Sequence, residues 1–219
     1  MEFINIHTHN HNTNAVSVIN LFPEDVDNVI PEKFYSVGIH PWNVSKINVS
    51  AQLQIISEIV TKENVIAVGE IGLDKLHPEF DLQKEIFLKQ LYIAEELKKP
   101  VIVHCVKAFS ELLEILKDEK QTVPIIIHRY SGNITIAEQL LKYGCYFSFG
   151  YDLFNSKSKV MKVFKKIPKE NIFLETDDAY ISIENVYQKA AEIKEISIKN
   201  ISEYILSNFN LVFGNIYPK

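Results

Sequence analysis

The chain has 219 residues, of which 47% are hydrophobic and 23% are charged, so a disordered or fibrous protein is excluded and a large buried core is possible. Its formal net charge is −5, which excludes the basic footprint typical of proteins that hold long nucleic acids. The two cysteines form no zinc-ribbon spacing, and no segment has the apolar length of a secretory signal or a membrane span. We therefore expect one compact cytoplasmic domain over residues 1–219, without membrane contact or an obligate protein partner.

Short apolar segments rich in β-branched residues alternate with longer amphipathic segments, a pattern typical of parallel strands joined by crossover helices. We predict strands at residues 3–7, 15–21, 34–39, 65–70, 101–104, 125–128, 145–149 and 172–175. Helices are predicted at residues 82–98, 109–117, 134–142 and 158–165, with one or two closing helices over residues 185–209. Eight strands favour an α/β fold of the TIM-type (β/α) barrel class.

The interval between the first two predicted strands is short. Residues 9–14 are too few for the dozen or more residues that normally connect adjacent parallel strands. The barrel is therefore predicted to be slightly trimmed near its first βα unit. Residues 15–21 are expected to pair antiparallel or irregularly, or to lie outside the barrel.

Histidines stand at the C-terminal ends of three predicted strands, where barrel enzymes carry their catalytic groups. His7 and His9 end the first strand and face the same side, because side chains alternate along a strand. Taken alone, such a pair is more often structural. His104 and His128 each end an apolar run that follows a proline, and this repetition is hard to attribute to packing. All four are candidate metal ligands.

Two acidic residues complete the candidate metal set. Glu70 follows a run too apolar to solvate a carboxylate, so it needs a cation or strong hydrogen-bond donors, and its two oxygens could bridge two ions. Asp177 follows the last predicted strand. A divalent ion lowers the pKa of its water to about 7 in favourable sites, and a neighbouring carboxylate can orient it or take its proton. Glu70 and Asp177 are therefore predicted to be catalytic as well as metal-binding.

The remaining candidates have weaker signals. His40, after the third strand, is predicted to bind substrate or to support a ligand, although a turn histidine bonded to the backbone is an equally good interpretation. Cys105 and Ser131 lack the setting of an activated nucleophile, which disfavours covalent catalysis. His11 and His77 lie in polar loop sequence and are predicted at the surface.

Taken in chain order, these motifs resemble the TatD family of metal-dependent hydrolases, within the amidohydrolase-like barrels. The similarity runs over nearly the whole chain. Its segments are residues 5–9 (family pattern Asp-x-His-x-His), 38–41 (Gly-x-His-Pro), 70–74 (Glu-x-Gly-Leu-Asp), 100–104 (Pro-Val-x-x-His), 128–132 (His-x-x-Ser-Gly) and 175–177 (Glu-Thr-Asp).

The resemblance implies two divalent ions and phosphodiester hydrolysis, with DNA ends, nucleotides or small phosphodiesters as substrates. It places one ion between His7, His9, Glu70 and Asp177, and the other between Glu70, His104 and His128. Family members are commonly described as magnesium-dependent deoxyribonucleases. By ligand preference, a histidine-rich set also suits zinc, manganese or iron, so the identity of the metal stays open.

Three departures from the family pattern concern the substrate side of the site. Asn5 replaces the usual aspartate, which removes a charge near the first ion, and Asp178 stands where the family has a small residue. Val106 replaces an arginine that the family pattern implies helps with phosphate. Arg129, the only arginine of the chain, is predicted to bind phosphate in its place.

Two other functions stay open. Amidohydrolases and PHP-type phosphoesterases that act on small molecules also begin with a His-x-His pair. The chain could also be a family member that has lost catalysis and keeps its metal ligands for stability or partner binding, a possibility supported by Asn5 and Val106.

Overall fold

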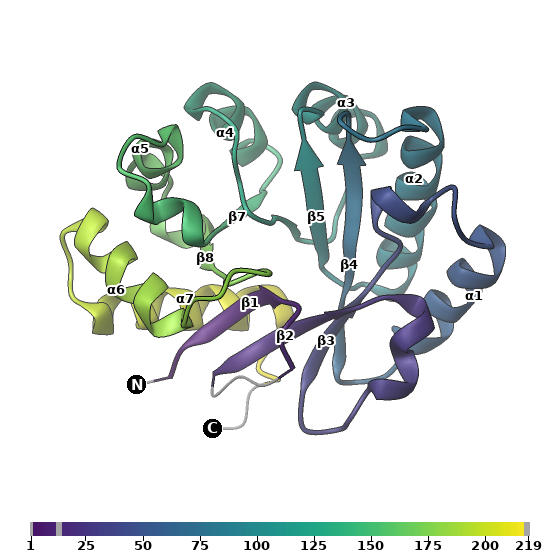
Figure 1. Ribbon diagram of the computed structural model, residues 1–219, viewed down its shortest axis with the longest axis horizontal. Helices are drawn as coiled ribbons and strands as arrows, with labels where there is room; N and C mark the ends of the chain where they lie inside the picture. The colour runs from purple at the N-terminus through teal and green to yellow at the C-terminus, as the bar shows by residue number, and fades with distance from the viewer. Residues whose placement is uncertain (1, 12–14, 217–219) are drawn as a thin grey trace.

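A computed structural model describes residues 2–11 and 15–216. One sheet of eight strands runs in sequence order, and every adjacent pair is parallel. Its edges meet where Thr8 bridges Asp177, so the predicted TIM-type barrel is confirmed (Figure 1). The strands are β1 (Ile4–Thr8), β2 (Val16–Leu21), β3 (Phe34–Val37), β4 (Val65–Asp74), β5 (Val101–Val106), β6 (Ile125–Ile127), β7 (Tyr146–Phe149) and β8 (Ile172–Leu174).

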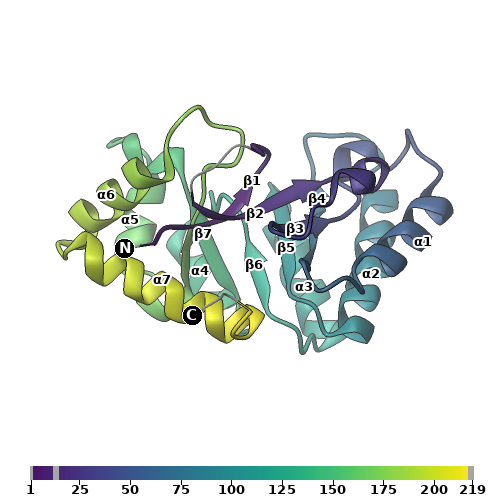
Figure 2. The ribbon, with the colours of Figure 1, turned by 90° about the horizontal axis from the view of Figure 1, so that it is seen from below.

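Helices flank the strands on two sides, as the view from below shows (Figure 2). Each predicted helix is present, and the closing segment forms two helices. An additional helix, α1, was not predicted; the side chain of Asn48 caps it by accepting a hydrogen bond from Ala51 N. The helices are α1 (Val49–Ile59), α2 (Phe80–Leu97), α3 (Phe109–Glu119), α4 (Ile134–Leu141), α5 (Lys159–Lys166), α6 (Ile183–Lys194) and α7 (Ile198–Phe213). Within the described residues, no helix has the length and hydropathy needed to cross a bilayer.

The second strand corrects the sequence-based expectation. β2 pairs parallel with both β1 and β3, so antiparallel pairing and a place outside the barrel were wrong, whereas the expected irregularity is present in the register of β1 and β2. Seven residues separate β1 from β2, and a chain that covers up to about 3.3–3.6 Å per residue is long enough over seven residues to return along a strand as short as β1. The register between β1 and β2 shifts between Asn5 and Thr8, next to this shortened link.

The approach of β4 to β5 depends on a glycine. Gly72 is the register partner of His104 and has a φ of 153°, a backbone conformation that side chains rarely adopt. A Cβ at this position would overlap the carbonyl oxygen of His104. The absence of a side chain at residue 72 therefore lets β4 bring Glu70 close to the histidine of β5.

We expect Gly72→Ala to lower the free energy of unfolding by about 3 kcal/mol, because the new methyl group forces β4 and β5 apart and strains the backbone. Gly144→Ala is the matched control. Gly144 also has a positive φ, 72°, but a Cβ there meets nothing within 4 Å. Gly144→Ala should lower the free energy of unfolding by about 1 kcal/mol, the cost of the left-handed backbone alone. Denaturant titration measures both values, and equal losses would contradict the close-approach argument.

Candidate metal centre

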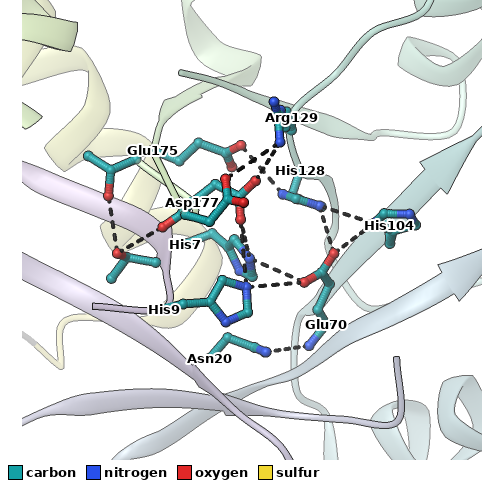
Figure 3. A network of polar contacts seen from close by, with 12 residues as sticks. His7, His9, Asn20, Glu70, His104, His128, Arg129, Glu175 and Asp177 are labelled. Atoms are coloured by element: carbon teal, nitrogen blue, oxygen red, sulfur yellow. Dashed lines mark hydrogen bonds and ion pairs between the residues drawn. The ribbon is translucent and has the colours of Figure 1, made fainter. Parts of the chain in front are cut away.

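The carboxylate of Glu70 lies between two groups of histidines at the C-terminal end of the barrel (Figure 3). Its Oε2 atom is 3.4 Å from His7 Nε2 and 3.7 Å from His9 Nε2. Its Oε1 atom is 2.8 Å from both His104 Nδ1 and His128 Nε2. The two oxygens of one buried side chain therefore face two separate sets of nitrogen atoms.

Asp177 completes the first group. Its Oδ1 atom is 3.6 Å from the Nε2 atoms of both His7 and His9. Donors bound about 2.1 Å from one ion lie roughly 3.0–3.4 Å apart, so these separations fit an ion after a small contraction. His7 is fully buried, and among the described residues neither of its ring nitrogens has a hydrogen-bond partner. Such orphaned nitrogens are costly unless something binds them, and a divalent cation fits the acidic, imidazole-rich surroundings.

The second group contains a third histidine. His40 Nε2 is 3.3 Å from Glu70 Oε1 and 3.4 Å from His104 Nδ1. His40 Nδ1 accepts a hydrogen bond from the backbone N–H of Trp42. In the neutral ring the proton must then be on Nε2, so His40 donates toward Glu70 rather than offering a lone pair to a cation. The backbone bond expected of a turn histidine is present, and the ring also contacts the Glu70 carboxylate.

Two buried carboxylates that were not predicted orient the other histidines. Asp74 Oδ2 accepts from His104 Nε2 at 3.3 Å, and His104 Nδ1 is 2.8 Å from Glu70 Oε1, where a metal ion would take the place of the proton that joins the two atoms. Glu175, fully buried, accepts from Ser148 Oγ, and its Oε1 is 3.4 Å from His128 Nδ1. Outer carboxylates of this kind fix the tautomer and raise the basicity of metal-binding imidazoles. Asp74 is the last residue of the motif at 70–74, and Glu175 is the first residue of the motif at 175–177. Only the fold reveals which histidine each one contacts.

The charges of the site are strongly coupled. Burial alone would raise the pKa of Glu70, but the positive charge of His128 and the hydrogen bonds from His104, His128 and His40 hold it well below its usual range. Burial alone would lower the pKa of His128, yet the carboxylates of Glu70 and Glu175 raise it well above its usual value. Glu70 thus stays ionised and requires positive charge, which a proton on the histidine or a metal cation can supply.

β2 also contributes to the centre. Asn20 Oδ1 accepts a hydrogen bond of 2.6 Å from the backbone N–H of Glu70 and one of 3.1 Å from Ser36 Oγ. The amide therefore ties neighbouring strands together at the level of the carboxylate. Sequence reasoning missed this residue, because the strand that carries it was not expected to be a regular member of the barrel.

Arg129 lies beside the first group and contacts acidic residues. Its Nη1 atom is 3.0 Å from Asp177 Oδ2, and its Nε atom is 3.3 Å from Asp152 Oδ2. Asp177 is thus held by the arginine through one oxygen while the other faces His7 and His9. About half of the guanidinium side chain is exposed, so it is also accessible to a ligand.

A pocket of about 680 Å³ opens over both groups and has the size of a small-molecule site. Cys105 lines it but is buried, and burial raises the pKa of its thiol, which disfavours the reactive thiolate form. His11 is exposed, as predicted. His77 is only partly exposed, because its ring stacks on Trp42 at the mouth of the site.

Known proteins share this arrangement of sequence and fold. The profile of a family described as TatD related DNase matches residues 8–214. The chain belongs to the TatD family. A metal-dependent hydrolase of Bacillus subtilis, YabD, is 30% identical over 199 residues, which cover 82% of this chain and 77% of YabD. The human 3'-5' RNA nuclease TATDN2 is 32% identical over 153 residues, which cover 65% of this chain and 20% of the human protein.

Solved structures agree on the fold. YjjV, a TatD homologue from Escherichia coli, superposes with a TM-score of 0.88 at 22% identity, covering 99% of this chain and 98% of YjjV. A TatD family hydrolase from Entamoeba histolytica gives a TM-score of 0.82 at 17% identity, with 98% and 99% of the two chains covered. The chain is thus a TatD-family metal-dependent hydrolase with the barrel of that family.

The replacement of the usual TatD aspartate by Asn5 has a structural explanation. Asn5 Oδ1 accepts from Thr176 N, and Asn5 Nδ2 donates to Thr176 Oγ1 at 2.8 Å. The threonine hydroxyl is then free to donate to Thr8 Oγ1, which in turn donates to the carbonyl oxygen of Asp177. The amide therefore begins a chain of hydrogen bonds that closes the barrel between β1 and the segment after β8.

We expect Asn5→Asp to lower the unfolding free energy of the metal-free protein by about 1 kcal/mol or more. The carboxylate cannot donate to Thr176 Oγ1, so one hydrogen bond of the closing chain is lost and a charge is buried. Asn133→Asp is the control, because Asn133 caps α4 only by accepting a hydrogen bond from Ile136 N, which an aspartate also does. Denaturant unfolding in chelator compares the two, and equal stability of both variants would contradict the donor role of Asn5.

Proposed function

We propose that this TatD-family hydrolase cleaves phosphodiesters by means of two divalent ions, with DNA ends, nucleotides or small phosphodiesters as substrates. The observation that carries the proposal is the position of Glu70, whose two oxygens face separate groups of nitrogen donors below one pocket. Two-ion sites suit phosphoryl transfer, because the attacking and leaving oxygens can both be stabilised. The DNase description of the family and the nuclease name of the human relative support the same reaction class.

In this proposal His7, His9, Glu70 and Asp177 hold one ion, and Glu70, His104 and His128 hold the other. Magnesium, manganese and zinc are the candidate ions. Histidine-rich donors favour zinc, whereas the carboxylate oxygens of Glu70 and Asp177 also suit magnesium or manganese. The bound ions would supply a water-derived nucleophile near neutral pH and neutralise charge on the phosphate.

The side chains around the ions have separate tasks. Asp177 is placed to accept the proton of the attacking water as well as to hold the first ion, and Arg129 fixes its carboxylate through Oδ2. His40 carries its proton on Nε2 and directs it at Glu70, and it would donate to a substrate oxygen only where that oxygen takes the place of the carboxylate as acceptor. Arg129 is placed to contact a phosphate oxygen with the part of its guanidinium that remains exposed. No cysteine or serine nucleophile is required.

The charge of the chain favours small substrates over long nucleic acids. The net charge is −5, and the arginine at the pocket lies among Asp152, Asp177 and Asp178. A long polyanion gains little from such a surface, since affinity for the phosphate backbone grows with the number of cationic contacts. A chain end or a nucleotide needs only the pocket itself.

The first test is elemental analysis of protein purified without chelator, combined with hydrolysis of bis-p-nitrophenyl phosphate and short DNA in added metal. We expect up to two divalent ions per chain and measurable hydrolysis. His104→Ala should lose an ion and at least 100-fold in activity, because the second group loses a nitrogen donor. His11→Ala should change neither, since His11 is exposed and outside both groups.

The outcomes separate the alternatives. Hydrolysis of amide substrates without hydrolysis of phosphate esters would support an amidohydrolase. A full metal content without hydrolysis across both substrate classes would support a family member that no longer catalyses. Absence of bound metal together with absence of activity would overturn the proposal entirely.

The role of Arg129 is tested with Arg129→Lys. We expect kcat/KM for phosphodiesters to fall about 10-fold or more at unchanged metal content, because an ammonium group cannot contact both Asp177 and a phosphate in a planar geometry. Lys165→Ala is the control and should behave as wild type, because it removes only an exposed cation of α5 that pairs with Glu195. Unchanged hydrolysis by Arg129→Lys would exclude phosphate binding by Arg129. A parallel loss of metal would assign its effect to the positioning of Asp177.

A further inference from the structure

Trp42 is an exposed aromatic side chain that is nevertheless fixed in place. It is the only tryptophan of the chain and lies in the short 3-10 turn Pro41–Asn43 that follows β3. Its Nε1 atom donates a hydrogen bond of 2.7 Å to Asp74 Oδ2, while 46% of the residue remains exposed. An ordered indole at the surface offers a large planar area at little further cost in conformational entropy.

The surroundings of Trp42 leave one part of the ring open to the pocket. His77 stacks on the indole with ring centroids 4.3 Å apart and an interplanar angle of 23°. Trp42 lines the pocket whereas His77 does not, so His77 backs the indole from outside the pocket. Edge-on contacts at 4.9 Å to His40 and 5.9 Å to His104 place the indole next to the second histidine group.

We propose that Trp42 forms a stacking platform for a nucleobase adjacent to the phosphate that is cleaved. This inference rests on the proposed function, because it assumes that the phosphate lies over the two groups of ligands. A base attached to that phosphate is the planar group that would meet the indole. Stacking on an aromatic side chain is tolerant of sequence, because every base has a π-face. The platform therefore selects nucleotides over phosphodiesters that lack a base.

The single tryptophan allows a direct binding test. Stacking of a base quenches or shifts indole emission, and all tryptophan emission of this protein comes from residue 42. We expect a nucleoside 5′-monophosphate to quench the emission of the wild-type protein at lower concentration, and to a greater extent, than ribose 5-phosphate. Equal responses to the two ligands would contradict the platform.

A kinetic test compares two short oligonucleotides, one of which has an abasic analogue in place of the base next to the cleaved phosphate. The wild-type kcat/KM should favour the intact oligonucleotide about 10-fold or more. Trp42→Ala should reduce this ratio toward one, whereas Trp42→Phe should keep much of it. The ratio is the readout because loss of the hydrogen bond to Asp74 affects both oligonucleotides alike. Tyr143→Ala is the control, since Tyr143 has a similar exposed fraction, 45%, and does not line the pocket.

The results distinguish the two levels of the proposal. An unchanged ratio in Trp42→Ala, with both oligonucleotides hydrolysed, would overturn the platform and leave the phosphodiesterase intact. Failure to hydrolyse either oligonucleotide or bis-p-nitrophenyl phosphate would overturn the proposed function. The emission titration then decides about the platform alone: base-dependent quenching supports a nucleotide-binding pocket, and equal quenching by both ligands overturns it.

Discussion

The buried carboxylate of Glu70 is the constraint on which the rest of the site depends. Only 4% of the residue is exposed, and an isolated charge at such a position costs several kcal/mol. The barrel offsets this cost by directing a histidine nitrogen at the carboxylate from β1, from the turn after β3, from β5 and from the end of β6. No pair of adjacent strands could supply these donors. Closure of the sheet is therefore what brings together the groups that neutralise this carboxylate.

The second nitrogen of each imidazole determines what the first can do. Asp74 accepts from the outer nitrogen of His104, and Glu175 lies 3.4 Å from the outer nitrogen of His128, so the inner nitrogen of each ring can serve a metal ion that replaces its proton. His40 is the opposite case, because its Nδ1 accepts a backbone N–H and its Nε2 must carry the proton. Three histidines around one carboxylate oxygen are thus divided into two candidate ligands and one donor. The division follows from hydrogen bonds outside the group.

This dependence explains what could be predicted from the sequence. The strands and candidate ligands were identified because an apolar run followed by a polar residue is a local signal, and the motifs follow one another in a family order. β2 was misjudged because seven-residue links are rare between parallel strands, whereas an extended link suffices for a strand as short as β1. Asn20, Asp74 and Glu175 were missed because their partners are far away in the sequence and are set by strand register. Trp42 gave no signal at all, since a tryptophan in a turn has neither the spacing nor the chemistry of a ligand.

The pairing of Arg129 with Asp177 shows how a local backbone cost supports the site. Both residues have positive φ values, 42° and 52°, which cost free energy for residues with a side chain. In these conformations the guanidinium of one meets the carboxylate of the other at 3.0 Å. The family pattern implies an arginine where this chain has Val106, the last residue of β5, and the only guanidinium of the chain follows β6. Its positive charge lies at the Asp177 carboxylate of the first group, where it acts on the residue proposed to accept the proton.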